Sequence, residues 1–499
     1  MEDGKPFPGR SEKQKEISMI DPDKLKKALA HAQKLGASYA DIRYVSARSE
    51  EVKVKNRIVN AIRRSEESGA GLRALADGAW GFAASADLSG RSLLGLAEKA
   101  VALARASSLI SREPVELAER PAYQGSYRTP VKTDPEDVPL REKIDVLNSA
   151  CGEMCIAPEI ATTEASLAWQ KQEKLFVDTE GGEILQHLTE CGAGISATAV
   201  GWGDVQRRSY PTSFGGNFAG AGFEFIRGMP LKENAAAVAR EALTLLSAPA
   251  CPSAVTDLIL DSSQLALQVH ESCGHPAELD RVLGMEAGYA GTSFLTPEKL
   301  GAYVYGSPVV NITADATLPG GLGTFGYDDE GVPAAHFMLI KDGIFCGYLA
   351  SRETAPKIGT ASNGCMRASG WQFIPLVRMT NINLEPGDWT LDEIIRDTRE
   401  GLFLATNTSW SIDDKRLNFQ FATEAAYEIN NGSIGRLYKN PTYAGKTPEF
   451  WRSCDAIAGK AEWVMWGIPA CGKGEPCQIA HVGHGASPAR FRQVRVGIR

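Results

Sequence analysis

The segment His270-Glu271-Ser272-Cys273-Gly274-His275 carries two histidines, with a glutamate directly after the first. It resembles the H-E-x-x-H pattern of zinc peptidases, in which two imidazoles hold the ion and the carboxylate moves protons, but it is one residue longer. A regular α-helix turns about 100° per residue, so the two rings would lie about 140° apart and could not meet one ion. A π-type turn takes one more residue per revolution and returns both rings to one face. The spacing therefore predicts a helix with a π bulge.

The flanking residues agree with a site helix. Residues 254–260 read as a buried strand, and a polar residue at 261–263 can cap the helix that follows. Gly274 would lower the free-energy cost of the bulge, and Pro276 would end the helix. The alternative is a surface helix with two unrelated histidines. Because the chain has only seven histidines, chance would produce this pattern less than about once in a hundred such chains.

Composition limits the class of protein. A chain of 499 residues exceeds what one core usually supports, so two domains are expected. A net charge of −8 without a basic stripe argues against nucleic acid as the partner. The N-terminus lacks an apolar signal region and no later run is long enough to span a bilayer, which predicts a cytoplasmic protein with no membrane contact. The ten scattered cysteines indicate reduced thiols, with one of them available for a metal.

The order of predicted elements favours an α+β fold in two domains. Residues 1–18 are predicted to be a flexible tail, 19–247 an α+β domain with an antiparallel sheet, and 254–499 a β-rich domain carrying one metal-site helix. Helices are predicted at 22–36, 92–106, 140–154, 232–246 and 391–400. Strands of the first domain are predicted at 41–45, 51–54, 71–76, 80–84, 164–169, 174–178 and 192–199.

A catalytic zinc commonly takes three protein ligands and leaves one position for water, so the two histidines need a partner. Candidates lie near the end of the chain: Cys471, Cys477, His481 and His484. Gly472 leaves the backbone beside Cys471 unhindered, which would allow its thiolate to approach a metal closely. Chemistry alone leaves all four candidates open.

Four separated motifs resemble one known family. They are the site segment, Gly323-Thr324-Phe325-Gly326-Tyr327-Asp328-Asp329-Glu330-Gly331, Arg378-Met379-Thr380-Asn381 and Cys471-Gly472-Lys473. In this order they resemble the TldD/PmbA family of zinc metallopeptidases, specifically its TldD branch. The resemblance covers most of the chain and is strongest from about residue 254 onward.

The resemblance implies a specific site and assembly. It implies that His270 and His275 are Zn²⁺ ligands, that Cys471 completes the zinc site, and that Glu271 is the catalytic glutamate. It also implies an N-terminal α+β domain, a β-rich C-terminal domain, and a dimer whose inner cavity holds the zinc. The partner would be a second copy or a PmbA-like (TldE) homologue without the metal motif, and the substrate an unfolded peptide, such as the precursor of a modified peptide antibiotic.

Two stretches depart from the family pattern. Residues 479–485 carry histidines where apolar or small residues are expected, and residues 410–416 replace a Gly-rich loop. Both departures bear on the choice of substrate, and His481 or His484 could line the cleft. Neither affects the proposed ligands.

These observations favour a zinc-dependent metallopeptidase in which Glu271 takes a proton from a zinc-bound water and passes it to the leaving amine. An extended peptide could pair with an exposed strand edge. One alternative is a peptide-binding or assembly subunit with structural zinc, but such a site has no use for Glu271 and usually has four protein ligands. Another is a zinc amidase acting on small molecules, which only the resemblance disfavours.

The acidic cluster Asp328-Asp329-Glu330 allows two interpretations. It could bind a substrate amine or orient the site, or it could be a tight turn with solvated carboxylates. The sequence does not identify a second electrophile for the scissile carbonyl.

Overall fold

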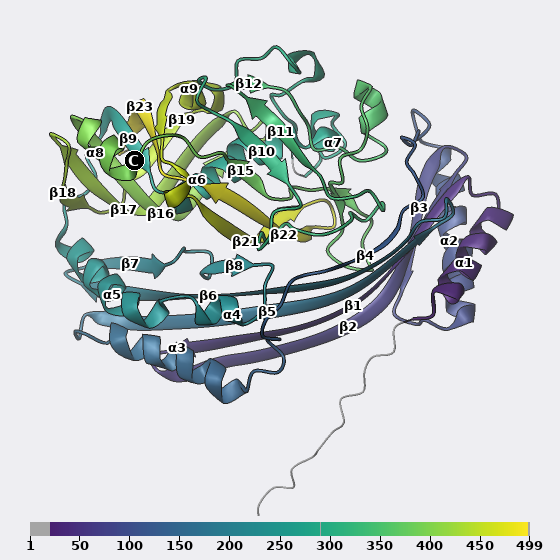
Figure 1. Ribbon diagram of the computed structural model, residues 1–499, viewed down its shortest axis with the longest axis horizontal. Helices are drawn as coiled ribbons and strands as arrows, with labels where there is room; N and C mark the ends of the chain where they lie inside the picture. Colours follow the sequence, from purple (N-terminus) through teal and green to yellow (C-terminus); the bar gives the residue numbers. More distant parts are fainter. Residues whose placement is uncertain (1–19, 290, 498–499) are drawn as a thin grey trace, which may run out of the picture.

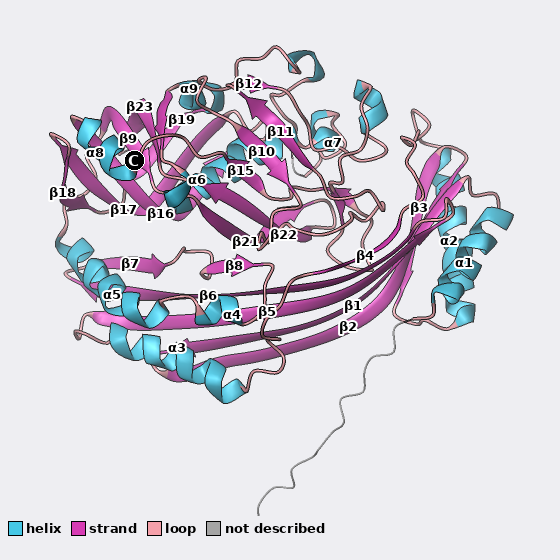
Figure 2. Cartoon of the chain, in the orientation of Figure 1, coloured by secondary structure: helices cyan, strands magenta, loops and turns pink. Residues whose placement is uncertain are grey.

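The computed structural model describes residues 20–289 and 291–497 of the chain. A long curved sheet from the first half forms one layer, and the second half lies over it (Figure 1). Figure 2 shows strands running through both layers, helices along the long sheet, and helices both within and around the second half. The predicted α+β class is confirmed. The predicted tail at residues 1–18 lies outside the described residues.

The first half contains α1 (Pro22–Lys34), β1 (Tyr39–Lys55), β2 (Ile58–Ala76), β3 (Ala79–Ser85), α2 (Gly90–Ser108), β4 (Gln124–Arg128), α3 (Leu140–Met154), β5 (Ile160–Asp178), β6 (Glu183–Gly201), β7 (Asp204–Tyr210), β8 (Asn217–Ala219), α4 (Glu224–Arg227) and α5 (Leu231–Ser247). The four helices predicted in this half are therefore confirmed, with ends shifted by a residue or two. Asp21 caps α1 by accepting a hydrogen bond from the backbone of Asp23.

The strands of the first half form a sheet in the order β3-β2-β1-β5-β6-β4, and β7 and β8 also pair with β6. Pairing is antiparallel as predicted, except that β4 runs parallel to β6. The prediction of separate short strands at 41–45 and 51–54 was wrong, because both belong to β1. The polar stretch between them stays in the sheet because Glu50 is buried and accepts hydrogen bonds from Lys143 Nζ (2.6 Å) and Trp169 Nε1 (3.1 Å).

Alternation along β1 decides which face of the sheet meets the second half. Ile42 belongs to the core with α1 and α2, and Val52 to the core with α3 and α5. Side chains at even positions of one strand share a face, so both helix pairs cover the same side. Arg43 points to the other side, where its Nη2 atom donates a 2.6 Å hydrogen bond to the carbonyl of Phe373 in the second half. The second half therefore packs on the helix-free face.

The second half contains β9 (Ala254–Leu260), α6 (Ser262–Val269), η1 (His270–Gly274), η2 (His275–Ala277), α7 (Leu279–Val282), η3 (Pro297–Lys299), β10 (Ile312–Asp315), β11 (His336–Lys341), β12 (Ile344–Phe345), η4 (Ala355–Ile358), β13 (Met366–Arg367), β14 (Leu376–Val377), β15 (Ile382–Leu384), α8 (Leu391–Asp397), β16 (Glu400–Ile412), β17 (Asn418–Asn430), β18 (Ser433–Tyr438), β19 (Thr442–Lys446), α9 (Thr447–Arg452), β20 (Cys454–Ile457), η5 (Lys460–Glu462), β21 (Val464–Lys473), β22 (Gln478–Ala486) and β23 (Ala489–Val496).

This half is rich in short strands, as predicted, but its helices differ from the expectation. The helix predicted at 391–400 ends at Asp397, because the chain enters β16 at Glu400 and pairs there with β17. Two short helices, α7 and α9, were not predicted. Each is too short to show helical periodicity in the sequence.

The largest sheet of the second half positions the site helix. Its order is β16-β9-β23-β19-β17-β18, so β9 lies between two partners and its last residues are fully buried. The chain leaves β9 directly into α6, whose Leu265 and Val269 belong to the main core of this half. The site helix is therefore fixed on one side by the sheet.

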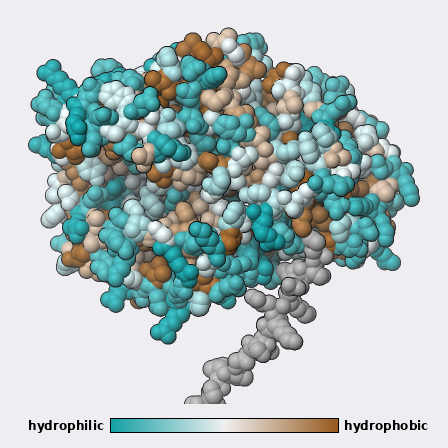
Figure 3. Space-filling view, viewed as in Figure 1, coloured by the Kyte–Doolittle hydropathy of each residue, from teal (hydrophilic) through white to brown (hydrophobic). Residues whose placement is uncertain are grey.

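The helices and the surface were compared with what a membrane-spanning segment needs. Among residues 20–289 and 291–497, no helix combines the length and the apolar character needed to cross a bilayer. On the face shown in Figure 3, hydrophobic residues occur in small groups among hydrophilic ones. That face offers no broad apolar surface.

Candidate metal centre

The site helix changes its winding where the motif begins. It is α-helical over α6, winds as a π-helix over His270–Gly274, and ends in a short 3₁₀ turn at His275–Ala277. Asp261 caps its start by accepting a 3.0 Å hydrogen bond from the backbone of Gln264. The predicted strand, cap and π bulge are all present.

Tertiary contacts hold the π turn. The hydroxyl of Tyr305 donates to the carbonyl of Ser272, and Trp451 Nε1 donates to the Ser272 hydroxyl at 2.9 Å. Gly274 allows close packing: its φ of −71° is ordinary, but a Cβ atom there would lie 2.0 Å from the sulfur of Met379. Glycine therefore suits this position by its small size rather than by its backbone freedom.

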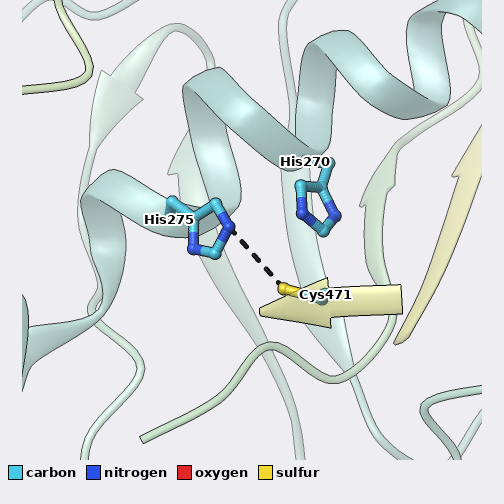
Figure 4. A group of neighbouring side chains, drawn as sticks. All are labelled: His270, His275 and Cys471. Atoms are coloured by element: carbon cyan, nitrogen blue, oxygen red, sulfur yellow. Dashed lines mark hydrogen bonds between the residues drawn. The ribbon is translucent and has the colours of Figure 1, made fainter. Parts of the chain in front are cut away.

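Three of the predicted site residues meet in space. His270 and His275 come from the π turn and Cys471 from β21, and their ligand atoms lie within 4.8 Å of one another (Figure 4). Cys471 Sγ lies 3.6 Å from His275 Nε2, and all three side chains are buried. The structure thus brings together the two imidazoles and the thiol predicted as metal ligands, although 196 positions separate Cys471 from His275.

This arrangement fits a zinc ion. Ligands at the usual Zn–N and Zn–S lengths around a tetrahedral ion would place a nitrogen and a sulfur about 3.6 Å apart. Burial lowers the pKa of both histidines, which favours the neutral, ligating imidazole. Burial alone would raise the pKa of Cys471, but nearby His275 and Arg378 outweigh it and lower this pKa, which favours the thiolate.

A buried carboxylate orients His275. The Nδ1 atom of His275 lies 3.0 Å from Glu278 Oε2, which leaves the Nε2 atom of His275 to face Cys471. Burial opposes ionisation of Glu278, but Lys473 and His275 hold its pKa well below the usual range. The sequence analysis missed Glu278. Its signal was the carboxylate three residues after a proposed ligand.

His484, from β22, orients His270. His270 Nδ1 lies 2.8 Å from His484 Nε2, and His484 Nδ1 lies 3.1 Å from the carbonyl oxygen of Ile382. A carbonyl only accepts, so His484 carries its proton on Nδ1 and accepts a hydrogen bond from His270 at Nε2. His270 Nε2 is then left for the metal. His484, a candidate third ligand from the sequence, therefore lies behind His270, a proposed ligand.

The other two candidates lie elsewhere. His481 points to the opposite side of β22 from His484, where its Nδ1 atom lies 2.5 Å from Glu190 Oε2 in the first half. Cys477 is exposed near the end of the β21–β22 turn. Neither residue is grouped with the three predicted ligands.

Glu271 has a charged partner that the sequence analysis did not identify. Arg416 Nη1 donates a 2.5 Å hydrogen bond to Glu271 Oε2. Arg416 lies in the turn between β16 and β17, at the end of the stretch that departs from the family pattern. No local signal in the sequence joins two residues 145 positions apart.

The acidic cluster forms a tight turn, as one interpretation expected, but its carboxylates are buried rather than solvated. Asp328, Asp329 and Glu330 are buried where the two halves meet. Asp329 Oδ1 lies 2.6 Å from Lys174 Nζ, and Glu330 Oε1 lies 3.2 Å from Arg73 Nη2. Asp329 and Glu330 are thus paired with cations of the first half and join the two halves, whereas Asp328 accepts hydrogen bonds from backbone N–H groups. Because Asp328 and Asp329 also line a cavity, the binding of a substrate amine stays a prediction.

The chain is similar to known metallopeptidases. The chain matches models described as PmbA/TldA metallopeptidase domain 1 (residues 40–104), central domain (133–248) and C-terminal domain (253–497). A metalloprotease of Methanocaldococcus jannaschii is 31% identical over 456 residues, which is 91% of this chain and 95% of that protein. A zinc metalloprotease TldD homolog of Saccharolobus solfataricus is 27% identical over 34% of this chain and 37% of that protein.

The fold is also found in a solved structure. TldE from Thermococcus kodakarensis superimposes with a TM-score of 0.72 at 15% identity, covering 95% of this chain and all of that one. Because the sequence match spans nearly the whole chain, the resemblance read from its motifs is confirmed. The chain belongs to the PmbA/TldD family of metallopeptidases.

Proposed function

We propose that this chain is a zinc-dependent metallopeptidase that hydrolyses unfolded or extended peptides. The observation that carries the proposal is the position of Glu271, directly beside a cluster of two imidazoles and one thiol. His270, His275 and Cys471 would hold the ion through Nε2, Nε2 and Sγ. Three protein ligands leave one position free, as in catalytic zinc sites.

When bound, the zinc ion would make a water molecule acidic enough to attack a peptide carbonyl near neutral pH. Glu271 would take the proton from the attacking water as its oxygen bonds to the carbonyl carbon. It would then deliver that proton to the amide nitrogen as the C–N bond breaks, leaving a carboxylic acid and an amine. Glu278 and His484 would fix the two imidazoles during this exchange.

Two adjoining cavities between the layers support an extended substrate. A cavity of about 960 Å³ is lined by Phe214, Phe218 and Pro469, and a second of about 310 Å³ lies next to it. Both are lined by Glu190 and His481, so the two cavities share a border. Spaces of this volume could hold a segment of open chain, whereas a folded domain would not fit. Pro469 precedes Cys471 by two residues, which places the larger cavity near β21.

Assembly belongs to the same proposal. The working unit would be a dimer of this chain with itself, or with a PmbA/TldE-like homologue that lacks the metal motif. Two other functions use the same residues: a peptide-binding subunit with structural zinc, and a zinc amidase for small molecules. The ion pair between Glu271 and Arg416 gives the glutamate a place in the site that structural zinc would not need.

The test measures bound zinc and peptide cleavage for the purified chain, alone and with a metal-less homologue. Glu271→Ala should keep its zinc and lose turnover, while Cys471→Ala should lose both. Cys477→Ala is the matched control, since this thiol is exposed and outside the cluster. Equal cleavage by all variants would refute the proposal. Zinc and peptide binding without cleavage would favour the assembly subunit, and cleavage restricted to small amides would favour the amidase.

A further inference from the structure

Arg416 reaches the proposed proton-transfer group with only part of its guanidinium. Its Nη1 atom donates to Glu271 Oε2 at 2.5 Å. Arginine–carboxylate pairs are often bidentate, with two parallel N–H bonds. Here the buried Nε atom has no hydrogen-bond partner among the described residues. The guanidinium is therefore held by one edge and retains an unused donor.

The turn that carries Arg416 is fixed, so this arginine is preorganised. The Asp413 carboxylate accepts hydrogen bonds from the backbone of Leu417 (2.7 Å) and Asn418 (3.1 Å). The carbonyl of Arg416 itself accepts a 2.8 Å hydrogen bond from the hydroxyl of Thr447. Such a turn can present a cation without rearrangement during the reaction.

Neighbouring segments hold the same turn from the other side. The carbonyl of Asp414 accepts a 3.0 Å hydrogen bond from the backbone of Thr292, and that of Lys415 accepts one of 2.9 Å from Phe294. Arg416 has a φ of +62°, in the left-handed region that most side chains avoid. The surrounding hydrogen bonds therefore fix an arginine in a conformation that glycine would adopt more easily.

The charge of Arg416 also reaches the metal centre. Burial is the main cause of the lowered pKa of His270 and of His275, and Arg416 adds to the lowering of both. The side chain is only about one-sixth exposed, so water screens this charge weakly. Arg416 is a cation beside Glu271 that both proposed imidazole ligands sense.

We propose that Arg416 is a catalytic residue whose guanidinium donates a hydrogen bond to the oxygen of the scissile carbonyl as that oxygen becomes negative. This inference rests on the proposed peptidase function and supplies the electrophile that the sequence did not identify. As the water oxygen bonds to the carbonyl carbon, the electron pair of the C=O bond moves to the carbonyl oxygen. Arg416 stabilises the negative charge on that carbonyl oxygen. The pair returns when the C–N bond breaks, and the amine leaves with the proton from Glu271.

The step needs no other reactant. Removing one oxyanion donor of this kind typically lowers kcat about 10²–10³-fold. Because the donor acts on the transition state, KM should change far less.

The experiment compares Arg416→Gly and Arg416→Lys with the wild type in the zinc-loaded full chain. Glycine suits the left-handed backbone at this position, so Arg416→Gly removes the guanidinium without straining the turn. Lys415→Ala is the matched control, since it removes an exposed cation from the same turn. The measurements are kcat, KM, zinc content and calorimetric affinity for a phosphinic peptide, whose tetrahedral phosphorus imitates the intermediate.

Arg416→Gly should keep its zinc, lose about 10²–10³-fold in kcat, and lose affinity for the phosphinic peptide by a similar factor. Added guanidinium ion should restore part of the activity of Arg416→Gly. The kcat of Arg416→Lys should lie between those of Arg416→Gly and the wild type. Unchanged phosphinic affinity in Arg416→Gly would overturn the inference even if kcat fell, because the arginine would then act only by holding Glu271. A rise in KM at constant kcat would also overturn it.

The two proposals can fail separately. If the wild type cleaves peptides and Glu271→Ala does not, but Arg416→Gly binds the phosphinic peptide as tightly as the wild type, only the role of Arg416 is refuted. If the zinc-loaded wild type neither cleaves peptides nor binds the phosphinic peptide, both proposals are refuted.

Discussion

The Nδ1 atom of His270 lies 2.8 Å from the Nε2 atom of His484, although 214 positions separate the two residues. The second departure from the family pattern reaches the same helix: Arg416 contacts Glu271, the neighbour of His270. Residues that seemed to concern substrate choice therefore act on the motif itself. One of them orients a proposed ligand and the other pairs with the proposed proton carrier.

Replacing His484 with alanine should lower zinc affinity about 10–100-fold, the usual effect of losing a partner behind a metal ligand. His270 would lose the acceptor that fixes its ring and keeps its proton on Nδ1. The affinity can be measured by competition with a chromophoric chelator. His481→Ala is the control, because this histidine lies on the opposite side of β22 and pairs with Glu190. Equal zinc affinity in His484→Ala and the wild type would contradict the role assigned to His484.

Zinc should stabilise the fold, since its ligands come from the site helix and from β21. At a free zinc concentration about 1,000 times the Kd, binding adds about 4 kcal/mol to the free energy of unfolding. A chelator should therefore lower the Tm of the wild type. Cys471→Ser should have the low Tm with or without zinc, and Cys477→Ser should respond as the wild type does. A zinc-dependent rise in Tm that survives Cys471→Ser would show that the ion binds elsewhere.

Lys473 is fully buried with two carboxylates, and its loss should be costly. Its Nζ atom lies 2.7 Å from Asp280 Oδ1 and 3.4 Å from Glu278 Oε2. Lys473→Met should lower the free energy of unfolding by about 3–5 kcal/mol, because Asp280 and Glu278 each lose a buried cation, although Arg281 still contacts Glu278. It should also weaken zinc binding through Glu278, which orients His275. Lys446→Met, at an exposed lysine, should change neither denaturant unfolding nor zinc affinity.

Local signals in the sequence were enough to predict most helices and the part of the site that lies on the π turn. The helix at Leu140–Met154 was predicted with its observed ends because Pro139 directly precedes a run of apolar residues at helical spacing. The π turn followed from the spacing of His270 and His275, since both ligands lie on one segment. Such features depend on neighbours in the chain.

Features that depend on the tertiary fold could not be predicted. Cys471 was preferred among four candidates only through a family resemblance, because no spacing rule spans 196 positions. The polar stretch inside β1 looked like a break between two strands. Its Glu50 is buried with Lys143 and Trp169, and both of these partners come from other elements. Solvated carboxylates at residues 328–330 were one open interpretation for the same reason, because the cations that pair with Asp329 and Glu330 lie in the other half of the chain.

Asp329 should make the contact between the two halves sensitive to acid. Burial alone would raise its pKa, but Lys174 and Arg43 outweigh it and hold this pKa below the usual 3.8. A carboxyl with a lowered pKa in the folded state contributes stability above its unfolded pKa, and this contribution is lost as pH falls through the folded value. At pH 7, Asp329→Asn should therefore lower the free energy of unfolding by about 3–5 kcal/mol, because the buried Arg43 and the partly buried Lys174 lose their partner.

The difference in stability between the wild type and Asp329→Asn should depend on pH. Between pH 7 and about 5 the gap in Tm between the wild type and Asp329→Asn should stay constant, and below the unfolded pKa of 3.8 it should shrink, because the wild-type carboxyl then takes up a proton. Thermal unfolding followed by circular dichroism over this range measures the gap. Asp388→Asn, at an exposed aspartate, should match the wild type throughout. A gap that widens on acidification would mean that Asp329 is protonated in the folded protein, and the ion pair with Lys174 could not then be what joins the halves.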